Sequence, residues 1–143
     1  MKVSTKGRYG LMAIVDLAVN DKEKQVSLKS VAERQGLSEN YLEQLFASLK
    51  KAGLVKSIRG AQGGYRLAKP AEKITVGDVL RSLEGTLCPV NCIDTSNSCD
   101  KVDVCVTVPV WAKLRDKINE VVDSFTIADL VLDYENKMKI DNI

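Results

Sequence analysis

The pattern of apolar and polar positions predicts several short helices in the first half of the chain. Apolar residues recur at helical spacing in three segments: 7–20, 28–35 and 39–52. Ser27 and Ser38 precede the second and third segments, where a hydroxyl group would cap a helix. Gly36 interrupts the second segment, and Gly53 follows the third at the position where a left-handed residue usually ends a helix. We therefore expect a helix, a tight turn and a second helix, which is the helix-turn-helix pattern.

Two short segments with strand character follow, at residues 54–58 and 65–68. The loop between them holds Gly60, Gly63 and Gly64 and has arginine at its edges. This pattern predicts a β-hairpin with a flexible, basic tip. A helix-turn-helix followed at once by a basic hairpin is the layout of a winged helix.

A second group of helices is predicted after the hairpin. Thr75 and Asp78 resemble a capping box at the start of a fourth helix, which ends at Gly85. A later helix of about four turns carries an apolar stripe formed by Val110, Trp111, Leu114, Ile118, Val121, Val122 and Phe125. This stripe indicates either a contact with a partner subunit or a helix that folds back on its own domain. One short helical stretch, residues 127–137, comes last.

The expected fold class is therefore mainly α with a small β-hairpin. A winged helix-turn-helix domain would occupy residues 1–84, a cysteine-rich segment 85–108, and a long dimerisation helix with its tail 109–143. No apolar run approaches the roughly 20 residues of a membrane helix, and no signal-like segment begins the chain. We expect a cytoplasmic protein that does not enter a membrane.

Charge is distributed unevenly along the chain. Residues 1–70 contain 13 Lys and Arg against 6 Asp and Glu, whereas residues 71–143 contain 8 against 13. A basic first half favours a polyanionic partner, and with the winged-helix pattern it predicts double-stranded DNA.

The amino-terminal end of the helix at 39–52 would enter the major groove. This places Ser38, Asn40, Tyr41, Glu43 and Gln44 near base edges. Asn40 and Gln44 can pair with adenine, and Glu43 can accept a hydrogen bond from the amino group of cytosine.

The hairpin and the surrounding basic residues would add contacts to the DNA backbone. Arg59, Gln62 and Arg66 lie on the hairpin. Phosphate contacts are expected from the basic side chains Lys2, Lys6, Arg8, Lys50, Lys51 and Lys56. A monomer offers too few contacts, so we expect a homodimer that binds a palindromic operator.

All four cysteines lie between residues 88 and 105, with the spacing Cys88-x3-Cys92-x6-Cys99-x5-Cys105. Zinc usually takes ligand pairs two to four residues apart, and only the first spacer fits that rule. Thiolates from a long irregular loop suit an iron–sulfur cluster. A reversible thiol switch and a chance grouping are the alternatives.

The chain has no histidine, no phosphate-binding glycine loop and no paired nucleophile and base, which argues against an enzyme.

MKVSTKGRYGL begins the chain, LSENYLEQLFASLKKAGLVKSIRGAQGGYRL fills its middle, and C-x5-C-x5-W lies late in it. These stretches resemble the Rrf2 family of bacterial transcription regulators, with the greatest similarity to the branch that regulates iron–sulfur clusters. The first half is also similar to a branch that regulates cysteine metabolism and lacks cluster cysteines. The resemblance implies a winged-helix homodimer with recognition residues at Tyr41, Glu43, Gln44, Arg59 and Gly60.

The resemblance also implies a cluster site. The family's three cluster cysteines correspond to Cys92, Cys99 and Cys105, but its histidine ligand corresponds to Val108, and the spacer after Cys92 is one residue longer. Cys88 is the substitute ligand that the sequence offers. A [2Fe-2S] cluster is favoured over a [4Fe-4S] cluster, and zinc ranks below both. The alternative is a cluster-free regulator of cysteine metabolism controlled by thiol oxidation or a protein partner.

Overall fold

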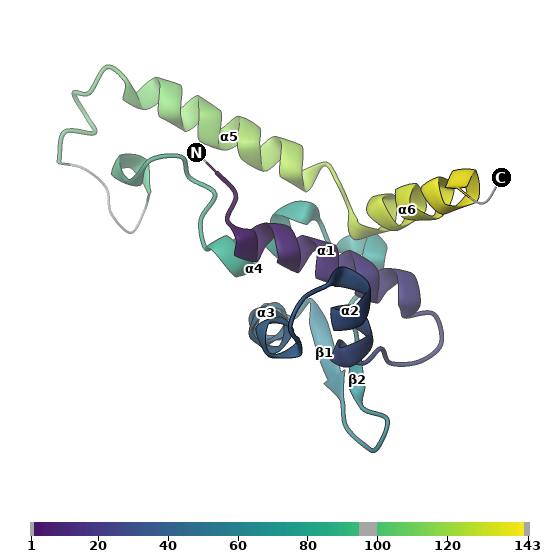
Figure 1. Ribbon diagram of the computed structural model, residues 1–143. Coiled ribbons are helices and arrows are strands. Elements are labelled where there is room, and N and C mark those ends of the chain that lie inside the picture. The colour runs from purple at the N-terminus through teal and green to yellow at the C-terminus, as the bar shows by residue number, and fades with distance from the viewer. Residues whose placement is uncertain (1, 95–99, 142–143) are drawn as a thin grey trace.

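The structure is a computed structural model that describes residues 2–94 and 100–141. Within these ranges the elements are α1 (Thr5–Asn20), α2 (Leu28–Gln35), α3 (Glu39–Lys51), β1 (Val55–Ile58), β2 (Gly64–Leu67), the 3-10 helix η1 (Ala71–Lys73), α4 (Val76–Glu84), the 3-10 helix η2 (Asn91–Ile93), α5 (Val108–Asp123) and α6 (Ile127–Asp141). The helices α2 and α3 and the hairpin lie at one end, with α5 and α6 at the other (Figure 1). The predicted mainly helical fold with one small hairpin is confirmed.

The predicted helix starts are confirmed by their hydrogen bonds. The hydroxyl groups of Ser27 and Ser38 each accept from a backbone N–H three residues later, at 3.2 and 3.0 Å. Thr75 and Asp78 form the reciprocal capping box, with bonds of 3.0 and 2.9 Å. The first helix begins earlier than its apolar pattern predicted, because Ser4 also acts as an N-cap.

One apolar core joins α1, α2, α3, α4 and the start of the hairpin. Its fully enclosed side chains include Ile14, Leu17, Val31, Leu42, Leu45, Phe46, Leu49, Ile74, Val79 and Ile127. At the crossing of α1 and α4, a Cβ atom on Gly10 would overlap Leu83, and one on Gly7 would overlap the Glu84 carboxylate. The two helices can approach this closely because glycine has no side chain.

The hairpin is an antiparallel pair with Val55 opposite Leu67 and Ile58 opposite Gly64. A third backbone segment lies beside it, since Val26 pairs with Tyr65 through two hydrogen bonds of 2.9 and 2.8 Å. The loop between α1 and α2 therefore extends the sheet on the β2 side.

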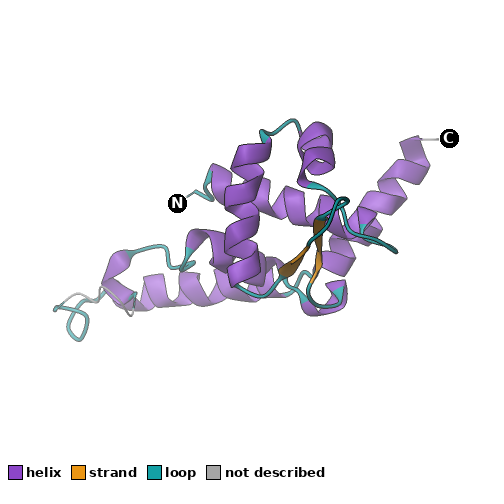
Figure 2. Ribbon diagram, turned by 90° about the horizontal axis from the view of Figure 1, so that it is seen from below, coloured by secondary structure: helices purple, strands orange, loops and turns teal. Residues whose placement is uncertain are grey.

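The helix α5 projects from the body and packs against α4 along one side (Figures 1 and 2). None of its residues is fully buried. Val110 and Val121 are each 57% exposed and Phe125 is 45% exposed. The other four residues of the predicted stripe, Trp111, Leu114, Ile118 and Val122, are half-buried, so the stripe is only partly covered in the single chain.

The final helix differs from its prediction. The helix α6 runs over 15 residues rather than the short stretch 127–137, and it packs against α1 and η1. The helix packs there because the chain returns to the core after α5, where the side chain of Ile127 is buried. Val76 donates its N–H to Phe125 at 2.9 Å, and Ile127 donates to Ile74 at 2.8 Å. Within the described ranges, no helix combines the length and apolarity that crossing a bilayer requires.

Candidate nucleic-acid interface and cysteine segment

The helix α3 is held by its apolar side and presents its polar side to solvent. Leu42, Leu45, Phe46 and Leu49 are completely buried and fix the helix to the core. The predicted groove residues Ser38, Asn40, Glu43 and Gln44 are all exposed. The structure therefore brings four of the five predicted residues to one accessible helix end.

Tyr41 differs from its neighbours on α3. Its side chain is half-buried and packs against the core, with its ring edge-on to that of Tyr9 at 6.4 Å between centroids. The helical repeat places residue 41 beside the buried Leu42 and Leu45. Tyr41 therefore packs against the core with part of its side chain and leaves the other part accessible to solvent.

The hairpin tip presents Arg59, Gly60 and Gln62 to solvent, as predicted. Gly60 has φ of 127°, a conformation that side-chain-bearing residues rarely adopt. Arg66 lies elsewhere. Its Nε donates to Asp21 Oδ1 at 2.6 Å, so this guanidinium is held against the α1–α2 loop at the base of the hairpin, with its side chain 35% exposed.

Two buried carboxylates organise this end of the molecule, and sequence reasoning missed both. Asp16 accepts from Arg34 Nη2 at 2.7 Å and from Gln35 Nε2 at 2.8 Å, which ties α1 to α2. The hydrogen bond with Asp16 raises the pKa of Arg34 above its ordinary value. Asp21 also accepts from the N–H of Leu67 at 2.8 Å. The sequence offered one sign of the Asp16 contact: this acidic residue lies three positions after Ala13, on the apolar face of its helix.

The predicted phosphate-contacting residues Lys2, Lys6, Arg8, Lys50, Lys51 and Lys56 are all exposed. Lys50 Nζ donates to Ser57 Oγ at 2.9 Å, which links α3 to β1. Exposed lysines on both elements place positive charge at this end of the molecule, which can favour binding to a nucleic-acid backbone.

A polar joint connects α4 to α5. The Arg81 guanidinium donates to Asn119 Oδ1 at 2.8 Å and to Asp123 Oδ2 at 2.6 Å. Thr75 Oγ1 donates to the same aspartate at 3.3 Å. Gly77 leaves room for these groups, because a Cβ atom there would overlap Asp123 and lie 2.9 Å from the Arg81 nitrogens. The last turns of α5 are therefore fixed relative to the helical body.

Three of the four predicted cluster cysteines lie in the described residues, and Cys99 lies outside them. Cys88 and Cys92 are half-buried, whereas Cys105 is exposed. Cys88 Sγ donates to Val90 O at 3.1 Å. In residues 2–94 and 100–141, no three cysteine or acidic side chains form a ready metal-binding group. The structure therefore does not bring Cys88, Cys92 and Cys105 together as a preformed site.

Cys88 borders a surface cleft of about 260 Å³ between the amino terminus, the end of α4 and α5. Lys2, Val3, Glu84 and Ile118 line the same cleft. The Glu84 carboxylate accepts from both the N–H and the hydroxyl of Ser4, which is the cap of α1. The first cysteine therefore lies next to the contact that fixes the start of α1.

Cys105 is exposed, and a neighbouring hydroxyl group affects its thiol. Its Sγ lies 3.1 Å from the Thr107 hydroxyl oxygen, and this hydrogen bond lowers the pKa of Cys105. A lowered pKa increases the thiolate fraction at any pH below it.

We expect Cys105 to react with iodoacetamide faster than Cys88 at pH 7.5 in the metal-free protein. Thr107→Val removes the hydroxyl donor, so the alkylation curve should shift to higher pH. Site-resolved mass spectrometry measures both rates, with Cys88 as the internal control because its surroundings are unchanged. Equal pH profiles for Thr107→Val and the parent chain would contradict the assigned hydrogen bond.

Comparison with known proteins agrees with this architecture. Residues 3–133 match the family model Rrf2, described as an iron-dependent transcriptional regulator. The HTH-type transcriptional regulator CymR of Bacillus subtilis (strain 168) is 47% identical over 130 residues, which cover 91% of this chain and 89% of the relative.

Two solved structures are similar along nearly the whole chain. The structure of CymR, the global cysteine regulator of B. subtilis, has a TM-score of 0.75 and 46% identity, covering 92% of this chain and 96% of that one. T. potens IscR has a TM-score of 0.76 and 52% identity, covering 96% and 90%. These relatives are regulators and not enzymes. The chain belongs to the Rrf2 family of transcriptional regulators, which bind DNA through a winged helix-turn-helix.

Proposed function

We propose that the chain is a homodimeric regulator that binds a palindromic operator and responds to an iron–sulfur cluster held by Cys88, Cys92, Cys99 and Cys105. The observation that carries the DNA-binding part is the exposed amino-terminal end of α3 beside a basic hairpin tip. Residues 1–84 would serve as the reading domain, 85–108 as the sensor segment, and 109–143 as the dimer contact. A DNA-binding role of this kind implies a cytoplasmic location.

The proposed reading of DNA uses two elements. Asn40, Glu43 and Gln44 on α3 would face base edges in the major groove. Arg59 and Gly60 at the hairpin tip would approach the minor groove or a phosphate, because the glycines of the tip let its backbone come close. The exposed lysines would position the protein without reading sequence.

The proposed dimer contact is the partly uncovered apolar stripe that runs along α5 to Phe125. Val110, Val121 and Phe125 expose about half or more of their surface in the single chain. Covering such a stripe with the same stripe of a second copy removes apolar surface from water, which stabilises the pair. A twofold pair would also present two α3 helices to successive major grooves, about one helical turn apart.

The donor set fits an iron–sulfur cluster, because four cysteines and no histidine offer four thiolates. Cys88 and Cys92 are half-buried, which would shield a cluster on one side, and the lowered pKa of Cys105 favours the thiolate that binds iron. The cluster would supply a redox-sensitive or iron-sensitive centre. Since the described cysteines are not preassembled, the segment would have to close around it.

Closure of the segment would act on the DNA-reading elements through contacts at both of its ends. At one end, Cys88 follows α4, whose Glu84 fixes the Ser4 cap of α1. At the other, α5 begins at Val108, three residues after Cys105, and is joined to α4 by Arg81. Strain in the segment would therefore change either the basic amino terminus or the relation between the two α3 helices.

Cluster content is the direct test. The protein purified without oxygen should contain iron and acid-labile sulfide and absorb visible light, with little zinc. Cys92→Ala and Cys88→Ala should each remove most of the iron, since each removes one proposed ligand. Ser82→Ala serves as the control, because it lies on α4 near the segment and offers no ligand. Full iron content in Cys88→Ala would show that Cys88 is not the fourth ligand.

A second candidate function is a cluster-free regulator of cysteine metabolism controlled by thiol oxidation or a partner protein. It is favoured by the absence of a preassembled ligand group among the described residues and by similarity to CymR. Iron-free protein that binds its operator fully, and loses affinity on oxidation of Cys105, would support this function over the cluster.

A further inference from the structure

The α1–α2 loop, residues 21–27, contacts the strand β2 at several positions. At the base of the hairpin, Asp21 accepts from Arg66 Nε at 2.6 Å and from the N–H of Leu67 at 2.8 Å. At mid-strand, Val26 and Tyr65 exchange two backbone hydrogen bonds. The base and the middle of the hairpin are therefore fixed by buried or backbone contacts.

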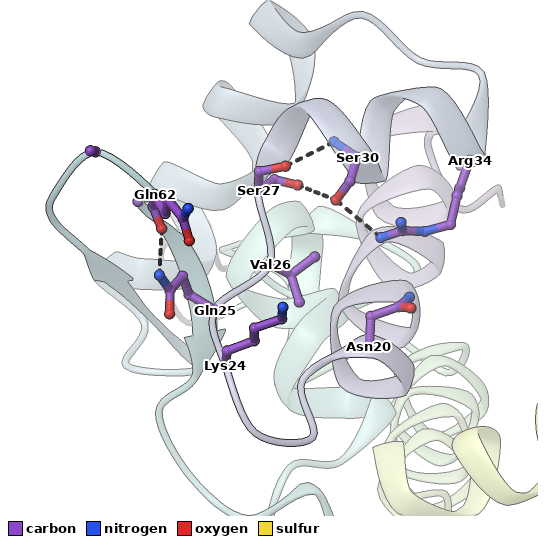
Figure 3. Close-up of a pocket in the computed structure, with 10 residues that line it drawn as sticks. Asn20, Lys24, Gln25, Val26, Ser27, Ser30, Arg34 and Gln62 are labelled. Atoms are coloured by element: carbon purple, nitrogen blue, oxygen red, sulfur yellow. Dashed lines mark hydrogen bonds between the residues drawn. The ribbon is translucent and has the colours of Figure 1, made fainter.

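The tip depends on a different contact. The side-chain amide of Gln25 donates to the backbone carbonyl oxygen of Gln62, and both residues line a surface cleft of about 470 Å³ (Figure 3). The tip closes on itself where the N–H of Gly63 donates to Gly60 O at 3.0 Å. Within the described residues, the Gln25 bond is the side-chain hydrogen bond that joins the tip to the rest of the domain.

We propose that Gln25 is a positioning residue for DNA binding: its amide holds the tip of the hairpin so that Arg59 is placed relative to α3 before DNA arrives. This inference rests on the proposed function, in which the tip contacts DNA. Gln25 itself is half-buried in the loop and is not among the residues that we propose to face DNA.

The physical effect is preorganisation. Glycines at positions 60 and 63 give the tip wide conformational freedom. A tip that moves freely has to be ordered when DNA binds, and that ordering opposes association. The Gln25 bond removes part of this freedom in the free protein. Its loss should weaken DNA binding without changing the stability of the core.

The test compares Gln25→Met with Arg59→Ala and the double variant, using fluorescence anisotropy with one operator duplex at constant salt. Methionine keeps the length of glutamine and removes the donor, and Gln25→Ala provides a second variant. Gln25→Met should weaken binding about fivefold, the order expected for one net hydrogen bond. In the Arg59→Ala background the same change should have an effect below about twofold, because the group being positioned is gone.

Each outcome separates the inference from the proposed function. If Arg59→Ala weakens binding but Gln25→Met does not, the positioning role is overturned and the hairpin contact stands. If Gln25→Met weakens binding equally with and without Arg59, Gln25 contacts DNA itself and the inference is overturned. If Arg59→Ala binds like the parent chain, both the hairpin contact and the inference fail. Faster amide hydrogen exchange at residues 60–63, with an unchanged unfolding midpoint, is the supporting structural result.

Discussion

The double variant Val110→Glu with Val121→Glu is expected to be a folded monomer whose affinity for a two-half-site operator falls by about a hundredfold or more. Both side chains are 57% exposed in the single chain, so glutamate at these positions meets solvent and leaves the core intact. In a dimer the same positions would bury four carboxylates against apolar surface, which strongly disfavours association. Each monomer would then bind one half-site of the operator independently of the other. Analytical ultracentrifugation and a binding titration measure the two effects.

The matched control places a carboxylate on the other side of the same helix. Lys113 is exposed on the charged side of α5, so Lys113→Glu changes the charge without touching the apolar stripe. This control should remain dimeric and keep most of its affinity. A double variant that still sediments as a dimer would show that the uncovered stripe is not the subunit contact.

Gly64→Ala is expected to lower the free energy of unfolding by about 3 kcal/mol, the upper range for overpacking a fixed site. A Cβ atom on Gly64 would overlap the carbonyl oxygen of Val26 and lie 2.7 Å from its carbonyl carbon. These are backbone atoms held by the Val26–Tyr65 pairing, so they cannot rotate away as a side chain could. The substitution should separate the α1–α2 loop from β2. Denaturant unfolding followed by circular dichroism measures the change.

Gly36→Ala is the control for this substitution. Gly36 has φ of 67°, and a Cβ atom there would meet no atom within 4 Å. Its replacement should lower the unfolding free energy by about 1 kcal/mol, from backbone strain alone. Equal effects for the two substitutions would mean that the loop moves away from the hairpin without loss, which would contradict the rigid third segment of the sheet.

Local signals were sufficient for most of the helices and strands, and for the exposure of most residues that we propose to read DNA. Ser38 caps α3 through a hydrogen bond that spans three residues, and the apolar repeat on α3 turns Asn40, Glu43 and Gln44 outward. The hairpin follows from its glycines and strand-like flanks. Such features depend on neighbours within one or two turns, so the sequence alone contains them.

The sequence by itself determined the family, the winged-helix elements and the four thiols that could hold a metal. Only the tertiary structure decided that Arg66 is bound by Asp21, that Ile127 returns to the core, and that Gln25 reaches the hairpin tip. It also decided that the described cysteines stand apart, with α5 uncovered on one side. The physical reason is range: capping and periodicity act within a few residues, whereas these partners lie far apart in the chain and meet only when the core packs.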